Sequence, residues 1–310
     1  MQSPWLIGID LGGTKTEVIL LDQFRREFFR HRVPTPQGDY PAILATIRML
    51  VEKAENIAGC RGNPVGVGIP GSVSGVTGRV KNSNSLCLNG QNLPGDLSSV
   101  LNRDVTVTND ANCLALSEAM DGAGQGAGVV FAAILGTGCG SGISVDGRLL
   151  NGPNGVAGEW GHNPLPWTPQ HELDQRPCFC GQTGCNETFV SGTGLALTHQ
   201  LLWNQALTAP EIVRAARADD RQAGDTMETY LEHLARGLAG VINLLDPDVI
   251  VLGGGVSNLQ ELYQRLPERL PRYVFGGECR TPIRQAMHGD SSGVRGAAWL
   301  AGDSDISNGG

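Results

Sequence analysis

The chain has 310 residues, with 31 acidic and 23 basic side chains, a net charge of −8 and 44 glycines. This length predicts one large domain or two smaller ones, with ample chain for a buried core. The acidic balance argues against a protein that binds a phosphate backbone, and no apolar run approaches the roughly 18 residues that a membrane-spanning helix needs. The N-terminus lacks the features of a signal peptide, so we expect a soluble cytoplasmic protein without nucleic-acid or membrane partners.

The first part of the chain predicts a hairpin followed by alternating helices and strands. Residues 5–10 (WLIGID) form a short apolar strand, the glycine turn GGTKT follows, and residues 17–21 form a second strand. Apolar side chains recur through residues 42–58 at the spacing of an amphipathic helix. The next predicted elements are strands at 65–69 and 105–108 and a helix at 111–120, which the glycine-rich stretch 122–128 ends.

The second part begins with the same kind of hairpin. Residues 129–135 are an apolar run bounded by glycine, which is typical of a buried strand, and the glycine turn 136–142 leads into a returning strand. One-face apolar spacing predicts a helix over 228–245, and a buried strand follows at 249–255. A last short helix is predicted at 294–300, and the polar tail 301–310 is expected to be disordered.

The two hairpins indicate an internal duplication. IGIDLGGTKTEVILLD near the start is similar to VFAAILGTGCGSGISVDG in the middle, because each is an apolar strand, a Gly/Thr turn and a second strand. This repeat predicts an α/β fold of two similar lobes that face a shared cleft. We expect a first lobe over residues 1–120 and a second over 121–300, with the helix near 290–300 packing back on the first lobe.

Both glycine turns are candidates for phosphate binding. Asp10-Leu11-Gly12-Gly13-Thr14-Lys15 places small residues where successive backbone N–H groups point at an anion, and adds a hydroxyl and a positive charge. Gly136-Thr137-Gly138-Cys139-Gly140 offers the same without the lysine. A tight hairpin turn is the alternative for either loop alone, but a two-residue hairpin does not need so many glycines. The P-loop pattern GxxxxGK[ST] does not occur in the sequence.

A third glycine-rich segment has the residue pattern of a dinucleotide-binding motif without the helix that the motif requires. Residues 66–71 (GVGIPG) fit GxGxxG, but the dinucleotide fingerprint needs a helix that begins at those glycines. Pro70 and the polar segment after it cannot begin an apolar-periodic helix. We therefore do not expect a dinucleotide cofactor.

Three cysteines stand within eight residues, at Cys178, Cys180 and Cys185. Such close thiolates repel one another unless a cation joins them, and His162 is the best candidate for a fourth ligand of Zn²⁺. A disulfide is the alternative, which a reducing compartment and the single residue between Cys178 and Cys180 disfavour. With four protein ligands the site is closed, so the predicted zinc is structural.

Several polar side chains stand where a sugar could be bound. Asn109 and Asp110 follow a predicted strand, Glu159 and His162 lie between glycines, and Glu187 comes two residues after the last clustered cysteine. Asp110 has a simpler interpretation as the N-cap of the helix that begins at Ala111. Together, however, these residues form a set that accepts several hydrogen bonds from hydroxyl groups.

At this point the chain resembles the ROK family (repressors, open reading frames and kinases). The resemblance rests on DLGGTKT, GIPG, NDAN, LGTGCG, GEWGH, CxCGxxGCxE and VLGGG, which occur in the family's order over essentially the whole chain. Within the family the sequence is most similar to bacterial fructokinases/mannokinases, on residues 81–90, 159–167, 274–279 and 288–300. N-acetylglucosamine kinases are near relatives. The implied fold is the actin-like ATPase (ribonuclease H-like) duplication.

The resemblance implies a role for each matching position. For ATP it implies Asp10 near Mg²⁺, a first phosphate turn of Gly12, Gly13, Thr14 and Lys15, a second of Gly136, Thr137, Gly138 and Gly140, and the nucleoside-side glycines Gly253, Gly254 and Gly255. It implies Asp110 as catalytic base and Asn84, Asn109, Asp110, Glu159, His162 and Glu187 as sugar contacts. It also implies His162, Cys178, Cys180 and Cys185 as the ligands of structural Zn²⁺.

The expected function is therefore an ATP-dependent hexose kinase, with fructose or mannose as the first choice and phosphorylation at the 6-hydroxyl. N-acetylglucosamine and glucose are alternatives, because the zinc-loop residues Phe179, Gln182, Thr183 and Asn186 depart from the family's pattern. A ROK repressor would carry a helix-turn-helix before the sugar fold, for which the first strand leaves no room. A non-catalytic sugar sensor is the remaining alternative, and the resemblance implies a homodimer.

Overall fold

The computed structural model describes residues 5–289 and 292–302, and these form two compact units. Among the described residues, the first unit comprises 5–122, 147–157 and 292–302. The second comprises Ala123–Asp146 and Gly158–Gly289. Among the described residues, no helix is both long enough and apolar enough to cross a membrane.

The first unit is built on a mixed five-stranded sheet with the order β3-β2-β1-β4-β7. Its strands are β1 (Leu6–Leu11), β2 (Lys15–Leu21), β3 (Glu27–Pro34), β4 (Val65–Ile69) and β7 (Val105–Asn109). β2 runs antiparallel to β1 and β3, whereas β4 runs parallel to both β1 and β7. The carboxyl ends of β1, β4 and β7 therefore meet at one edge. The short strands are β5 (Ser72–Val73), β6 (Val80–Lys81) and β10 (Arg148–Leu149).

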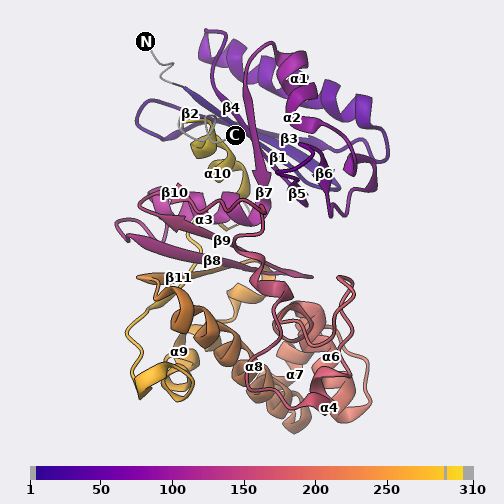
Figure 1. Ribbon diagram of the computed structural model, residues 1–310, viewed down its shortest axis with the longest axis vertical. Coiled ribbons are helices and arrows are strands. Elements are labelled where there is room, and N and C mark those ends of the chain that lie inside the picture. Colours follow the sequence, from indigo (N-terminus) through magenta and orange to yellow (C-terminus); the bar gives the residue numbers. More distant parts are fainter. Residues whose placement is uncertain (1–4, 290–291, 303–310) are drawn as a thin grey trace. The chain divides into compact units, whose positions relative to one another are not determined.

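Helices cover both faces of this sheet (Figure 1). The amphipathic helix α1 (Tyr40–Ala58) and α2 (Leu93–Leu101) pack their apolar sides on one face, and the short 3₁₀ helix η1 is Leu86–Leu88. Asp39 caps α1 by accepting a hydrogen bond from the Ala42 N–H (3.0 Å). On the other face lie α3 (Asp110–Asp121) and the C-terminal helix α10 (Ser292–Ala301). The last described helix thus belongs to the first unit.

The approach of α10 to the sheet requires glycine in the central strands. A Cβ on Gly66 would overlap the carbonyl oxygen of Ala297, and a Cβ on Gly8 would overlap that of Val294. Gly8 and Gly66 are paired across β1 and β4, so together they make one flat area under the helix. The GxGxxG match at residues 66–71 is thereby explained by packing, because β4 runs through it and no helix begins there.

The second unit repeats the arrangement of strands. The sheet strands that belong to this unit follow the order β9-β8-β11-β12, with β8 (Val129–Leu135), β9 (Cys139–Val145), β11 (Val249–Gly253) and β12 (Ile283–Gln285). β9 is antiparallel to β8, whereas β11 is parallel to both β8 and β12. As in the first unit, an antiparallel hairpin stands beside parallel strands.

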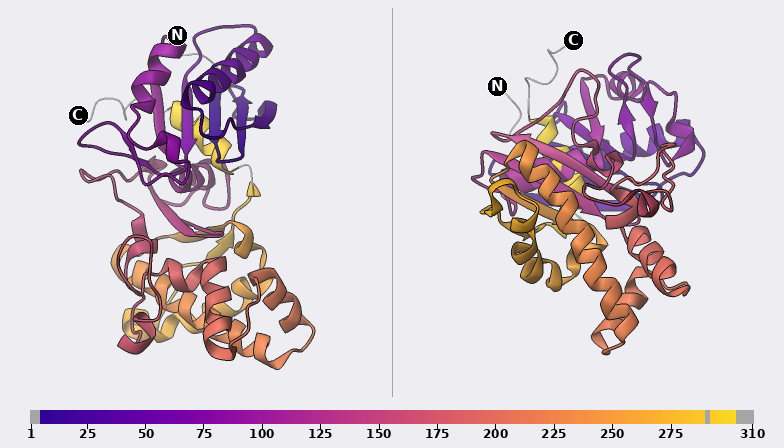
Figure 2. Two further views of the ribbon diagram at one scale, coloured as in Figure 1. Left: turned by 90° about the vertical axis from the view of Figure 1, so that its right-hand side faces the viewer. Right: turned by 60° about the horizontal axis from the view of Figure 1, so that its bottom comes forward.

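A layer of helices packs on the second sheet, with the long helix α8 (Arg221–Leu245) in its middle. Figure 2 shows α8 between α9 (Gln260–Arg269) on one side and α6 (Gly192–Trp203) and α7 (Ala209–Arg217) on the other. The other helical segments are α4 (Gln170–Leu173), α5 (Glu187–Val190), η2 (Glu159–His162), η3 (Gly255–Asn258), η4 (Leu270–Arg272) and η5 (Phe275–Gly277).

Most predicted elements occur with small shifts of their ends. The strands at 65–69 and 129–135 have the predicted bounds, and α8 begins at Arg221, seven residues before the predicted helix. The patterns did not predict β3, α2, α6, α7 or α9. Ala301, which we assigned to the tail, ends α10, and residues 303–310 lie outside the described residues.

Candidate active site

The first Gly-Thr turn joins β1 to β2. Within it the Gly12 N–H donates to the Lys15 carbonyl (2.9 Å). Thr35, just beyond β3, holds the turn from the side, since its hydroxyl donates to the Gly12 carbonyl (2.8 Å) and its N–H to the Thr14 carbonyl (3.0 Å). The rest of the turn is accessible to a ligand, because Gly13, Thr14 and Lys15 are exposed.

Three polar side chains stand at the edge where the carboxyl ends of the parallel strands meet. Asp10 lies near the end of β1, Asn109 ends β7, and Asp110 begins α3. The N-cap of α3 is Asn109, whose side-chain oxygen accepts from the Asn112 N–H (2.7 Å), so the interpretation of Asp110 as the cap is wrong. Asp110 is the first helical residue, and its Oδ1 accepts from the Ala111 N–H (2.8 Å).

The carboxyl group of Asp10 lies in an environment that disfavours its charge. Burial, and after it the negative charges of Asp110 and Glu17, raise the pKa of Asp10 from 3.8 to about 7, while Arg32 acts in the opposite direction. A cation beside Asp10 would remove most of that cost, and Mg²⁺ prefers carboxylate oxygens as protein ligands. The residues present therefore fit the Mg²⁺ that the resemblance implies.

The structure brings Asn84 to the first Gly-Thr turn. Asn84, Gly13 and Thr14 line one cavity of about 570 Å³. Asn109 lines another, smaller hollow of about 110 Å³ together with Asn112. The two predicted sugar-contact asparagines of the first unit therefore line different cavities.

The second Gly-Thr turn joins β8 to β9 and is held by the start of α6. The Gly136 N–H donates to the Gly138 carbonyl across the turn (3.0 Å). The Gly192 N–H donates to the Gly136 carbonyl (2.7 Å), and the Thr193 hydroxyl donates to the Thr137 carbonyl (2.8 Å). Two of the turn's carbonyl groups are thus fixed by α6.

Glu187, the first residue of α5, holds the start of β9. Its Oε2 accepts a hydrogen bond from the Cys139 N–H (2.8 Å), and a Cβ on Gly138 would lie 2.7 Å from the same oxygen. Glycine at position 138 therefore lets the carboxylate reach the turn. The sequence predicts Glu187 as a sugar contact, and the structure shows that one of its oxygens binds the backbone. Gly140 pairs with Ile134 inside the β8–β9 ladder rather than in the turn.

An apolar pocket of about 780 Å³ opens beside the second turn. Its lining includes Gly136 and Thr137 from the turn, Leu195 from α6, Val213 from α7 and Gly255 after β11. Apolar walls of this kind suit a heterocyclic ring. The sequence analysis did not predict that α6 and α7 line this pocket. The capped, glycine-rich helix start Ser191-Gly192-Thr193-Gly194 could have indicated α6.

Of the three glycines predicted on the nucleoside side, Gly255 lines this pocket and the other two do not. Gly253 is the last residue of β11. Gly254 has φ 81°, and a Cβ there would lie 2.6 Å from the carbonyl oxygen of Leu135. Gly254 therefore allows the turn after β11 to lie against the end of β8.

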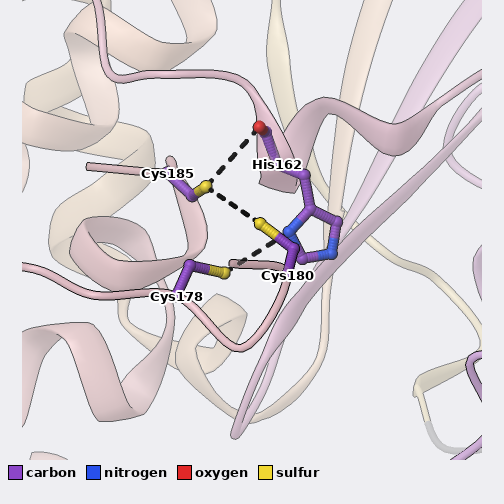
Figure 3. Close-up of side chains that lie close together, drawn as sticks. All are labelled: His162, Cys178, Cys180 and Cys185. Atoms are coloured by element: carbon purple, nitrogen blue, oxygen red, sulfur yellow. Dashed lines mark hydrogen bonds between the residues drawn. The ribbon is translucent and has the colours of Figure 1, made fainter. Parts of the chain in front are cut away.

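The predicted zinc ligands converge in the second unit (Figure 3). The ligand atoms of His162, Cys178, Cys180 and Cys185 all lie within 4.8 Å of one another. The distance from Cys178 Sγ to His162 Nδ1 is 3.5 Å, and that from Cys180 Sγ to Cys185 Sγ is 3.6 Å. Tetrahedral Zn²⁺ with Zn–S bonds of about 2.3 Å separates its sulfur ligands by about 3.8 Å. The cluster therefore fits zinc.

The thiols of the cluster differ in the direction of their pKa shifts. Burial raises the pKa of Cys178, and it raises the pKa of Cys185 to about 12. The Gln182 N–H, by hydrogen bonding, lowers the pKa of the exposed Cys180. Metals bind the thiolate form, so a bound cation would stabilise the charge that burial disfavours.

Glu159 and His162 stand on the single turn η2, which the core anchors. Trp160 between them is buried, and its indole N–H donates to the Gly237 carbonyl of α8 (3.1 Å). Glu159 and His162 are half-buried. The predicted residues thus divide between the units: Asp10, residues 12–15, Asn84, Asn109 and Asp110 lie in the first, and all the others lie in the second.

Comparisons with known proteins agree with this architecture. The family model described as the ROK family matches residues 6–304. The N-acetyl-D-glucosamine kinase of Salmonella typhimurium (strain LT2) is 41% identical over 297 residues, which cover 94% of this chain and 98% of the relative.

Two solved structures are similar over almost the whole chain. The ROK hexokinase from Thermus thermophilus has a TM-score of 0.87 and 31% identity, covering 98% of this chain and 100% of its own. A ROK family glucokinase from Streptomyces griseus, in complex with glucose and AMPPNP, has a TM-score of 0.75 and 29% identity, covering 96% and 98%.

The chain therefore belongs to the ROK family. Its fold is the actin-like ATPase duplication of the family's sugar kinases, as the sequence predicts.

We expect protein purified without chelator to contain about one zinc ion per chain, because four ligand atoms converge. Cys180→Ser should lower the zinc content and the melting temperature together, since metal binding contributes to the folding of the loop. Metal analysis and a melting curve test this. Cys279→Ser is the matched control, because Cys279 is a free, half-buried cysteine outside the cluster. A fully folded, zinc-free wild type would contradict the prediction.

Asp10→Asn should stabilise the unliganded protein above pH 7, because it removes a half-buried charge that two neighbouring carboxylates repel. A pKa raised from 3.8 to about 7 means that Asp10 costs no stability below about pH 4, an increasing amount between pH 4 and 7, and a constant amount above pH 7. The difference between variant and wild type should follow that profile and reach about 4 kcal/mol. Urea unfolding at several pH values measures it, and a gap that is independent of pH would contradict the expectation.

Proposed function

We propose that the chain is an ATP-dependent hexose kinase, which transfers the γ-phosphoryl group of ATP to a sugar hydroxyl. The observation that carries this proposal is the pocket of about 780 Å³ at the second Gly-Thr turn. Its apolar walls suit the nucleobase, and backbone N–H groups of the adjoining turn suit the phosphates. Membership of the ROK family, which includes the hexokinase and glucokinase described above, supports it.

In this proposal the first unit carries the reacting groups. Phosphoryl transfer has a loose transition state, so the protein contributes mainly position and charge neutralisation. Asp110 orients the sugar hydroxyl and accepts its proton as the bond to phosphorus forms. Asn84 and Asn109 hydrogen-bond other hydroxyls, and the turn at residues 12–15 binds phosphate oxygens.

The two metals have different roles in the proposal. Mg²⁺ supplies charge neutralisation when it is bound with ATP, and Asp10 is the residue that would hold it. Zn²⁺ would be structural, because His162 and the three cysteines fill its coordination. His162 presents Nδ1 to Cys178, which leaves Nε2 to donate to a sugar hydroxyl. Glu159, on the same anchored turn, accepts from a second hydroxyl.

The hexose that we propose first is fructose or mannose, phosphorylated at the 6-hydroxyl. This rests on the resemblance of residues 81–90, 159–167 and 274–279 to fructokinases/mannokinases. We propose N-acetylglucosamine as the second candidate, because the Salmonella relative with that activity in its name is 41% identical. Such identity leaves most side chains different, and kinases for several sugars share this fold. We also propose a homodimer, which light scattering tests.

A coupled assay with Mg-ATP and a panel of hexoses tests the function and ranks the sugars. We expect turnover with fructose and mannose and little ATP hydrolysis without sugar, because bound sugar supplies the acceptor hydroxyl. A preference for N-acetylglucosamine or glucose would replace the proposed sugar and retain the kinase. No turnover with any of the four, together with measurable sugar binding, would favour the non-catalytic sensor.

Asp110→Asn should reduce kcat by on the order of 10²–10⁴ with little change in sugar affinity, because the amide cannot accept the hydroxyl proton. The fold should survive, since Asn109 caps α3. Asp39→Asn is the matched control, because Asp39 caps α1 and Asn caps equally well. Steady-state kinetics at saturating ATP, with melting curves of both variants, measure the effects. Near-wild-type kcat would assign Asp110 a structural role.

A further inference from the structure

Arg176 is a buried arginine at the base of the zinc loop, which we define as residues 177–186. It is 2% exposed, and burial lowers the pKa of its guanidinium to about 10. One terminal nitrogen donates to the Thr188 carbonyl (2.6 Å) and the other to the Thr198 hydroxyl (2.9 Å). The guanidinium carbon lies 4.1 Å from the centroid of the Phe189 ring. Burying a charge is costly, so these directed contacts are what retain it.

The backbone of Arg176 closes the neck of the zinc loop. Its carbonyl accepts a hydrogen bond from the Gly184 N–H (2.8 Å). Arg176 stands two residues before Cys178, and Gly184 stands directly before Cys185. The same residue therefore joins the two arms of the loop through its backbone and reaches α5 and α6 through its side chain.

The elements that Arg176 reaches are those that hold the second Gly-Thr turn. Thr188 follows Glu187, whose carboxylate accepts from the Cys139 N–H at the end of that turn (2.8 Å). α6, which carries Thr198, begins at Gly192, and its first residues donate to the carbonyl groups of Gly136 and Thr137. α5 and α6 thus each contact both the turn and Arg176, through different residues.

We propose that Arg176 is a positioning residue for the second Gly-Thr turn and couples the zinc loop to nucleotide binding. The contacts run from the zinc loop through Arg176 to Thr188 and Thr198, and from α5 and α6 to the turn. The inference rests on the proposed function only in taking this turn as the ATP-phosphate site. Its consequence is that the zinc loop supports the nucleotide side of the reaction as well as the sugar side.

A purely structural role for Arg176 makes a different prediction. An arginine that only stabilises the second unit would, when removed, lower the melting temperature and leave the turn unchanged in the folded protein. A positioning role acts on the turn within the folded protein, so the backbone groups that face the phosphates lose their fixed geometry. Amide exchange of the turn and the affinity for Mg-ADP separate the two.

The test uses Arg176→Met in the full-length, zinc-loaded protein, because methionine retains a chain over Phe189 and removes both hydrogen bonds. Exchange of the amides in residues 136–140, measured without ligand, should become about tenfold faster. The Kd for Mg-ADP should rise about tenfold, while the Kd for the hexose changes less than about twofold. Arg103→Met is the matched control: Arg103 is partly buried in the first unit, where it donates to Glu55 and to the Asn63 carbonyl. It should lower stability without either effect.

Thr198→Val covers the case in which Arg176→Met does not fold, because it removes only one partner of the guanidinium. It should produce the same two effects at smaller size, and Arg176→Lys should recover part of the loss. Unchanged exchange at residues 136–140, or equal losses of ADP and hexose affinity, would overturn the inference. A wild type that binds Mg-ADP but phosphorylates no hexose would refute the proposed kinase and not the coupling, which the exchange measurement still decides.

Discussion

Both units depend on the same constraint, which is that a glycine turn stands at the carboxyl end of a strand with a parallel neighbour. In the first unit β1 passes through Gly12 to β2, and in the second β8 passes through Gly136 to β9. The next strands, β4 and β11, run parallel to β1 and β8. Because carboxyl ends of parallel strands meet at one edge, the turn with its N–H groups lies where the following loops bring their side chains.

The two turns are held by different means. Thr35 fixes the first turn through its hydroxyl and its N–H, so the support comes from the neighbouring strand β3. The second turn is supported by a helix pair that follows the cysteine cluster, through Glu187, Gly192 and Thr193. The proposed zinc would order this loop through four ligands, although the loop has little apolar surface to bury.

The negative charge of Asp10, near the first turn, lowers the stability of the unliganded protein. Asp10 is half-buried beside two other carboxylates, and burial together with their charges raises its pKa to about 7. Arg30 and Arg32 both pair with Glu17, so that carboxylate is compensated within the protein. The free-energy cost of ionising Asp10 is not compensated in this way, and a bound cation would reduce it. Functional sites commonly retain such unfavourable charges.

The sequence by itself determined the hairpins, the duplication and the close spacing of three cysteines. Apolar runs that end at glycine can be recognised from neighbouring residues alone, and Cys178, Cys180 and Cys185 lie close along the chain. The spacing of the cysteines did not by itself select His162 from the other histidines. Tertiary structure decided what depends on residues far apart in sequence. From the sequence alone, Gly66 belongs to an apparent nucleotide-binding motif, whereas the structure shows that this glycine allows α10 to pack on the sheet. From the sequence alone, Asp110 is a candidate N-cap of α3, whereas in the structure Asn109 accepts the capping hydrogen bond from the Asn112 N–H. Neither Arg176 nor the bond of Glu187 to Cys139 has a local signature, because each contact joins segments that only the fold brings together.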